Sequence, residues 1–142
     1  KSLRKRGYVG CNVTLPHKDA AMDIMAECSD LSRSVGSVNT VIVREDGSLY
    51  GDNTDVYGFK ENLSQRVPDI KSNLRKVNVL GAGGAARAVC VGLIGLGAKE
   101  ILLFNRNIER SAEVARDFGS AVRPQPWDQR SEMLGETLRM TC

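Results

Sequence analysis

A glycine-rich segment between an apolar strand pattern and a helical pattern constrains the fold of this chain more than any other feature. Val77-Asn78-Val79-Leu80 predicts a compact strand, and a helical pattern continues from the glycines to about Leu96. In this context the first glycine permits a tight turn, the second lets backbone approach a pyrophosphate, and the alanine keeps helix and strand close. The helix N-terminus adds N–H groups and partial positive charge. The predicted dinucleotide-binding loop consists of Gly81, Ala82, Gly83, Gly84, Ala85 and Ala86. A glycine-rich turn packed for steric reasons is the alternative.

A second strand and helix follow this loop at short spacing. Ile101-Leu102-Leu103-Phe104 predicts another buried strand, and Gly97 stands where a helix C-terminus commonly places glycine. Asn107 can cap the next helix, which Gly119 ends. Strand–helix–strand–helix with short connections is typical of a parallel sheet in an α/β fold.

The end of the second strand predicts which dinucleotide is bound. NAD-type sites carry Asp or Glu roughly 20 residues after the first glycine, whereas this strand ends in Asn105-Arg106. Arg106 and Arg110 are four residues apart across a helix start, a spacing at which both can flank one phosphate. The pattern therefore favours NADP over NAD. Alternatively, Arg110 is a solvated helix residue paired with Glu109 or Glu113.

The N-terminal half predicts a second, smaller α/β arrangement. We expect a strand over residues 8–14 and a helix that begins near Pro16 and presents one apolar stripe. A hairpin joins residues 38–43 to residues 49–51, and a helix follows Asn53-Thr54-Asp55. The predicted domains are 1–65 and 77–142, with a polar linker over 66–76. The members of the stripe are Ala21, Ile24, Met25 and Cys28.

Polar side chains gather at the predicted strand ends of this N-terminal half. Strand alternation places Asn12 and Thr14 on one face, with Lys18 in the first turn beyond. Further hydrogen-bonding groups are Asn39, Asn53, Thr54 and Asp55. Taken alone, Lys18 is typical of a solvated helix residue and Asp55 of an N-cap. Their spacing does not show that they meet.

Five ordered motifs resemble the shikimate dehydrogenase family. They are Asn12-Val13-Thr14-Leu15-Pro16-His17-Lys18, Gly36-Ser37-Val38-Asn39-Thr40, Gly51-Asp52-Asn53-Thr54-Asp55-Val56-Tyr57-Gly58-Phe59, Val79-Leu80-Gly81-Ala82-Gly83-Gly84-Ala85-Ala86-Arg87 and Asn105-Arg106. The resemblance spans residues 10–127. It implies part of an N-terminal α/β substrate domain followed by part of a Rossmann-like NADP-binding domain, and NADP-dependent reduction of 3-dehydroshikimate to shikimate.

The resemblance also implies roles for individual residues. Lys18 and Asp55 resemble the catalytic pair. The residues that resemble substrate ligands are Asn12, Thr14, Lys18, Asn39 and Asp55. Those that resemble cofactor ligands are Gly81 to Ala86, Asn105, Arg106 and Arg110. A dehydrogenase acting on quinate or a related hydroxy acid, and a non-catalytic remnant with a weak dinucleotide site, remain alternatives.

Composition limits the other classes of function. Lys and Arg exceed Asp and Glu by a net charge of only +3, and aromatic residues make up 5%, so neither a basic nucleic-acid patch nor a stacking platform is indicated. No apolar run is long enough to span a membrane. Cysteines without a Cys-x-x-Cys pair predict buried thiols in a reducing, cytoplasmic compartment and no metal site. A small-molecule substrate is the expected partner; oligomeric state is left open.

Several features depart from the family pattern. Family members begin with a segment in which a Ser-x-Ser pair holds the substrate carboxylate. No such segment precedes Lys1 in this sequence. Residues 135–142 differ from the apolar strand expected there, and Asn107 stands where Thr is usual. We therefore expect a central fragment of an enzyme that either binds NADP weakly or folds poorly, and that shows no turnover by itself.

Overall fold

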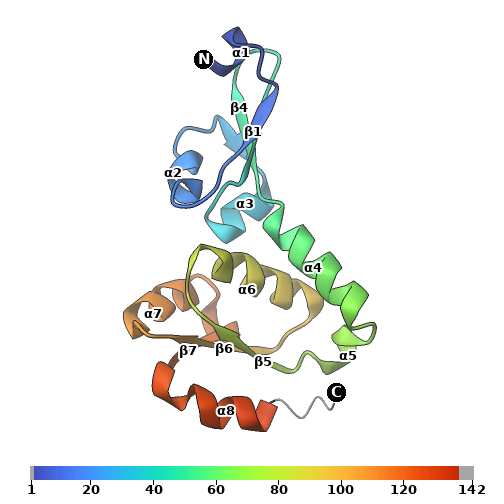
Figure 1. Ribbon diagram of the computed structural model, residues 1–142, viewed down its shortest axis with the longest axis vertical. Coiled ribbons are helices and arrows are strands. Elements are labelled where there is room, and N and C mark those ends of the chain that lie inside the picture. The colour runs from blue at the N-terminus through green and yellow to red at the C-terminus, as the bar shows by residue number, and fades with distance from the viewer. Residues whose placement is uncertain (1, 138–142) are drawn as a thin grey trace. The chain divides into compact units, whose positions relative to one another are not determined.

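The computed structural model describes residues 2–137, and the chain divides into two compact units between Gly58 and Phe59. One long helix, α4 (Asp55–Arg66), carries this boundary in its first turn. Each unit has a sheet of its own (Figure 1). Each also has its own cluster of buried apolar residues. We call them the N-terminal unit and the C-terminal unit.

A four-stranded mixed sheet organises the N-terminal unit. Its strand order is β1-β3-β4-β2, and only the β2–β4 pair is parallel. The turn at Gly47 joins β3 and β4 into the predicted hairpin. The core of this unit contains Val41 of β3, Cys28 of β2, Ala21 of α2 and Val38, which precedes β3. The elements are α1 (Ser2–Lys5), β1 (Gly10–Asn12), α2 (Lys18–Met22), β2 (Glu27–Cys28), α3 (Asp30–Val35), β3 (Thr40–Val43) and β4 (Leu49–Asp52).

The single long helix predicted after Pro16 is wrong. Pro16 lies in a turn, and α2 ends at Met22. Ile24 is 69% exposed, and Cys28 belongs to β2 rather than to a helical stripe. The backbone N–H of Ala26 donates to Leu49 O, so pairing with the edge of β4 replaces the helical hydrogen bonds.

A parallel sheet in the order β5-β6-β7 organises the C-terminal unit, as the strand–helix pattern predicts. In β6, residues Ile101 to Phe104 are all buried, which fits a strand covered on both faces. Figure 1 shows α6 and α8 on opposite faces of this sheet. The remaining elements are α5 (Ile70–Asn73), β5 (Lys76–Leu80), α6 (Gly84–Leu96), β6 (Glu100–Asn105), α7 (Ile108–Arg116), η1 (Gly119–Ala121), β7 (Val122–Pro126), η2 (Trp127–Gln129) and α8 (Arg130–Thr137).

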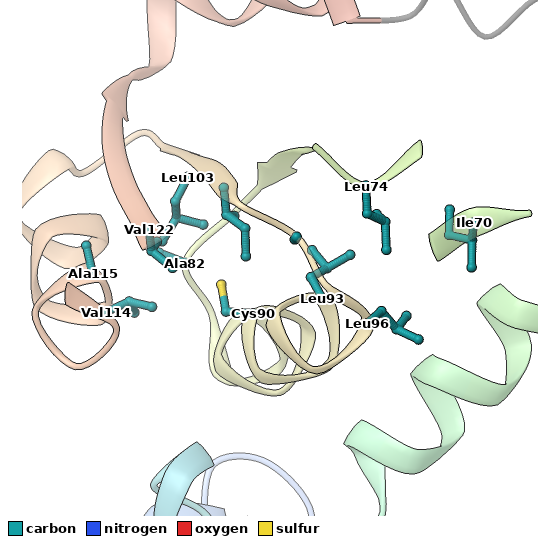
Figure 2. Packing of buried hydrophobic residues seen from close by; sticks show 12 residues of the cluster. Ile70, Leu74, Ala82, Cys90, Leu93, Leu96, Leu103, Val114, Ala115 and Val122 are labelled. Carbon is teal, nitrogen blue, oxygen red and sulfur yellow. The ribbon is translucent and has the colours of Figure 1, made fainter. Parts of the chain in front are cut away.

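The core of the C-terminal unit lies between α6 and the sheet. Cys90 and Leu93 of α6 are directed toward the strand that carries Leu103 (Figure 2). Two of the three predicted helix boundaries are confirmed: Gly97 is left-handed at φ +105° after α6, and the Asn107 side chain accepts a hydrogen bond from the Arg110 N–H at the start of α7. The third is wrong, because α7 already ends at Arg116 and Gly119 begins η1.

The predicted linker over residues 66–76 differs from the structure. Ile70 and Leu74 are buried in the core of the C-terminal unit, and α5 lies between residues 66 and 76. The unit boundary accordingly falls earlier, after Gly58. The segment carries two apolar anchors at helical spacing, and their burial outweighs its polar composition.

The structure also bears on the predictions for the cysteines, the C-terminal tail and a membrane span. Cys28 and Cys90 are buried as predicted, whereas Cys11 is exposed and Cys142 lies outside the described residues. Of the unusual tail over residues 135–142, the described part ends with α8 at Thr137. Within residues 2–137, no helix is both long and apolar enough to cross a bilayer.

Candidate functional site

Lys18 and Asp55 meet in the N-terminal unit, although the sequence spacing alone does not bring them together. The Lys18 Nζ donates to Asp55 Oδ2 at 2.7 Å. Lys18 lies at the start of α2 and Asp55 in the first turn of α4. Their side chains are 17% and 35% exposed, so the pair is partly shielded yet open to a ligand. No second acceptor binds Nζ within the described residues, which leaves two of its N–H groups available.

Asn39 holds the other oxygen of the Asp55 carboxylate. Its Nδ2 donates to Asp55 Oδ1 at 2.8 Å and to Thr54 Oγ1 at 3.1 Å. Its Oδ1 accepts from the Thr54 backbone N–H at 3.0 Å and from Thr40 Oγ1 at 2.8 Å. Asn39 is 8% exposed, and its amide group is fully engaged with the protein. The contacts of Asn39 therefore hold the Asp55 carboxylate in place. Binding of a substrate by Asn39 stays a prediction.

Asn53 fixes the backbone at the same point. Its Oδ1 accepts from the Asp55 N–H at 3.0 Å, and its Nδ2 donates to Ser37 O and Ser37 Oγ, both at 3.1 Å. The side chain is 1% exposed. Asn53 therefore ties the strand end before α4 to the segment that leads into β3.

The sheet register explains why these segments converge. Asn12 pairs with Thr40, and Thr40 pairs with Asp52, so the ends of β1, β3 and β4 lie side by side. In the described part of the chain, the Asn12 side chain is linked to the residues around Asp55 by one hydrogen bond, from Nδ2 to Asn39 O, which is long at 3.5 Å. Because β1 ends at Asn12, the predicted strand alternation does not extend to Thr14. Within residues 2–137, no hydrogen bond links the exposed Thr14 side chain to the cluster.

The predicted glycine loop joins β5 to α6 in the C-terminal unit. The Gly81 N–H donates to Phe104 O at 2.7 Å, and Gly81 has φ +98°, a conformation that only glycine adopts readily. Asn105 Oδ1 accepts from the Ala82 N–H at 3.3 Å and so anchors the loop to the end of β6. Ala86 is buried, as expected where helix and strand pack closely. Gly84 and Ala85 begin α6, whose N-terminus has no side-chain cap.

The packing of this chain does not require glycine at position 83. The φ of Gly83 is −84°, which any residue can adopt, and an added Cβ would meet no atom within 4 Å. Neither backbone conformation nor packing therefore explains glycine at this position. Close approach of a ligand to the backbone does explain it, and a pyrophosphate at a helix N-terminus has that requirement. The residues fit a dinucleotide here.

The two predicted phosphate-binding arginines lie beyond the end of β6. Arg106 and Arg110 are both exposed, and neither forms an ion pair within residues 2–137. The proposed pairing of Arg110 with Glu109 or Glu113 is thus not seen in this part of the chain. The Arg106 guanidinium carbon lies 5.9 Å from the ring centroid of Trp127. Two unpaired cations at a strand end without a carboxylate suit an additional phosphate.

Comparison with known families agrees with these features. A family model of the shikimate dehydrogenase substrate binding domain matches residues 1–41, and a model of shikimate / quinate 5-dehydrogenase matches residues 62–137. The chain belongs to the shikimate dehydrogenase family. The α/β fold predicted from the motifs is confirmed.

This chain matches only part of the length of individual relatives in the family. The chain is 46% identical over 134 residues to the shikimate dehydrogenase (NADP(+)) of Paramagnetospirillum magneticum, covering 94% of this chain and 49% of that one. The chain thus spans about half the length of the curated relatives it matches.

Two solved structures are similar in fold to this chain. A quinate dehydrogenase from Corynebacterium glutamicum in complex with NAD has a TM-score of 0.84 at 26% identity, over 99% of this chain and 49% of that chain. A shikimate 5-dehydrogenase from Thermus thermophilus in complex with NADP(H) and shikimate has a TM-score of 0.72 at 37% identity, over 87% and 45%.

The structure gives supporting roles to residues for which the sequence predicted none, including Asn53, which was expected only as a hydrogen-bonding group at a strand end. Ser37, Thr40 and Asn53 support the Lys18–Asp55 pair through Asn39 or through the backbone. Trp127 contacts Arg106 beyond the end of β6. For Asn53 a signal existed, because an amide between a strand end and a helix start commonly bonds its neighbours' backbone. For Trp127 no local pattern pointed to the contact.

Proposed function

We propose that this chain carries the catalytic pair and the dinucleotide loop of an NADP-dependent dehydrogenase that reduces 3-dehydroshikimate to shikimate. The observation that carries the proposal is the Lys18–Asp55 contact at 2.7 Å, with Asn39 on the second carboxylate oxygen. The family and the names of the relatives support the proposed substrate, cofactor and domain roles. The first 65 residues are assigned to substrate and catalysis, and residues 77–142 to the dinucleotide.

Lys18 is the proposed proton donor. Reduction of a ketone leaves negative charge on the carbonyl oxygen, and an ammonium within hydrogen-bond reach supplies a proton and stabilises that charge. Asp55 accepts one N–H of Lys18 and so fixes the direction of the ammonium group. The two remaining N–H groups can reach the substrate oxygen. When bound, the dinucleotide supplies the hydride.

The remaining polar residues are proposed to position the substrate and the cofactor. Asn12, Thr14, Asn39 and Asp55 would bind hydroxyl groups of the ring. Gly81 to Ala86 would hold the pyrophosphate, Asn105 would hold the loop, and Arg106 and Arg110 would bind the 2′-phosphate of NADP. The anchoring hydrogen bond from Ala82 N–H to Asn105 Oδ1 and the open space at Gly83 support this assignment.

A quinate-type activity is the second candidate. The quinate dehydrogenase from Corynebacterium glutamicum covers 99% of this chain with a TM-score of 0.84, and that protein was solved with NAD. Against NAD, the end of β6 in this chain carries Asn105 and Arg106 rather than a carboxylate.

A chimera tests the proposal and separates the candidates. Because the chain matches 49% of the Paramagnetospirillum magneticum enzyme, residues 1–137 can replace the matching stretch of that protein. We expect NADPH oxidation with 3-dehydroshikimate and a lower kcat/KM with NADH. Faster turnover of quinate with NAD would favour the second candidate. A folded chimera without turnover of either substrate would contradict both and favour a non-catalytic remnant.

A further inference from the structure

The chain's only tryptophan lies directly beside the predicted cofactor-selecting arginine. In the parallel register, Asn105 of β6 pairs with Pro126 of β7. The next residues, Arg106 and Trp127, therefore leave the sheet side by side at its carboxyl edge, where α/β folds bind their ligands. The Arg106 guanidinium carbon is 5.9 Å from the Trp127 ring centroid, within the range of a cation–π contact.

A second arginine fixes the indole ring from the following turn. Arg130 Nη1 donates to Trp127 O at 2.7 Å, and the Arg130 guanidinium carbon lies 4.5 Å from the ring centroid. Trp127 is only partly exposed. The ring is thus held by the first residue of α8, while Arg106 projects from the loop after β6.

The Trp127 ring is the one described partner of the Arg106 guanidinium within residues 2–137. No ion pair or hydrogen bond of its guanidinium is present within residues 2–137, so the ring is the partner that the structure gives it. A long exposed arginine without a fixed partner loses side-chain entropy whenever it binds an anion. A ring that already restricts the guanidinium reduces this cost.

We propose that Trp127 is a positioning residue that holds Arg106 for the 2′-phosphate of NADPH and thereby sets the preference over NADH. The inference rests on the proposed dinucleotide site. It adds a specificity determinant outside the glycine loop and outside the two arginines.

The test is the ratio of the NADH and NADPH dissociation constants, measured by calorimetry on this chain. Trp127→Leu removes the ring, and we expect NADPH binding to weaken about 2- to 5-fold with NADH binding unchanged, as a cation–π contact at an exposed site implies. Trp127→Phe keeps an aromatic face and should stay within about twofold of the wild-type ratio. In an Arg106→Gln background, Trp127→Leu should change the ratio no further, because coupled residues are not additive.

Tyr50 provides a matched control. The Arg44 guanidinium carbon lies 4.9 Å from its ring in the N-terminal unit, so Tyr50→Leu removes a similar contact elsewhere and should leave the ratio unchanged. Circular dichroism verifies folding, and Trp127→Met replaces the Leu variant if that variant unfolds. An unchanged ratio in the ring-deleted variant, or equal loss of NADPH and NADH binding, would overturn this inference and leave the proposed function standing. Absence of any nucleotide binding to the folded wild type would overturn the proposed function, and this inference with it.

Discussion

At the scale of single residues, Asn53 shows how a buried amide can set the position of a charged side chain. Asn53→Ala removes the acceptor of the Asp55 N–H and the donor to Ser37. Because these groups stay buried without partners, we expect the free energy of unfolding to fall by about 1–3 kcal/mol. Urea denaturation measures this change. Asn12→Ala is the control, since Asn12 is exposed and its hydrogen bond is 3.5 Å long; an equal loss in both variants would contradict the account.

The buried thiol of Cys90 should make the free energy of unfolding depend on pH. Burial raises the pKa of its thiol from 9.0 to about 11, although the nearby Arg87 acts in the opposite direction. The thiol is neutral when protonated, so its contribution to stability is fully present below pH 9 and is lost as pH rises toward 11. We expect the difference in unfolding free energy between wild type and Cys90→Ala to shrink by about 2–3 kcal/mol over this interval. A difference that stays constant across this interval would show that the thiolate is tolerated.

At the scale of elements, two glycines of α6 predict opposite effects of the same substitution. A Cβ at Gly92 would lie 2.7 Å from Phe59 Cδ1 of α4, whereas at Gly95 the nearest atom is Lys60 Nζ at 3.7 Å. Gly92→Ala should therefore lower the free energy of unfolding by about 1–3 kcal/mol. Gly95→Ala should raise it by about 0.5–1 kcal/mol, because alanine favours the helix. Thermal unfolding of the two variants checks this, and the same sign for both would refute the close packing of α4 on α6.

The glycine loop gives a second prediction at this scale, which separates ligand binding from folding. Gly83 is the N-cap of α6 and has extended backbone with open space around its Cα. Serine is a better N-cap than most residues, so Gly83→Ser should leave the unfolding free energy unchanged or raise it by up to about 1 kcal/mol. NADPH affinity should fall at least about tenfold if the pyrophosphate approaches this backbone closely. Retained affinity, measured by calorimetry, would contradict the assignment of the loop.

Local patterns predicted the elements of the C-terminal unit that are continuous in sequence. The apolar run of β6, the glycine loop and the Asn107 cap each follow from a few neighbouring residues. The strand β7 was not predicted, because Arg123, Pro124 and Gln125 interrupt any apolar pattern and its pairing with β6 supplies the strand. In the N-terminal unit the helical spacing of Ala21 and Cys28 was misleading, because pairing of β2 with β4 decided the structure there.

At the scale of the whole molecule, the candidate functional residues divide between two units with separate cores. The N-terminal unit holds Lys18, Asn39 and Asp55 around the ends of β1, β3 and β4. The C-terminal unit holds the glycine loop and Arg106 at the carboxyl edge of its parallel sheet. The pairing of Lys18 with Asp55 was expected from the family resemblance and not from the spacing of the two residues. They are 37 residues apart in the sequence, and the sheet register brings them into contact. Long-range contacts of this kind carry no local signal.

The kinetic effect of Lys18→Met shows whether Lys18 donates the proton. Methionine keeps much of the side-chain volume and removes the ammonium that contacts Asp55. In the chimera with the Paramagnetospirillum magneticum enzyme, we expect kcat for 3-dehydroshikimate to fall by about 10²–10⁴, while KM changes only a few-fold. An unchanged kcat with a raised KM would show that Lys18 only binds the substrate, and would contradict the account.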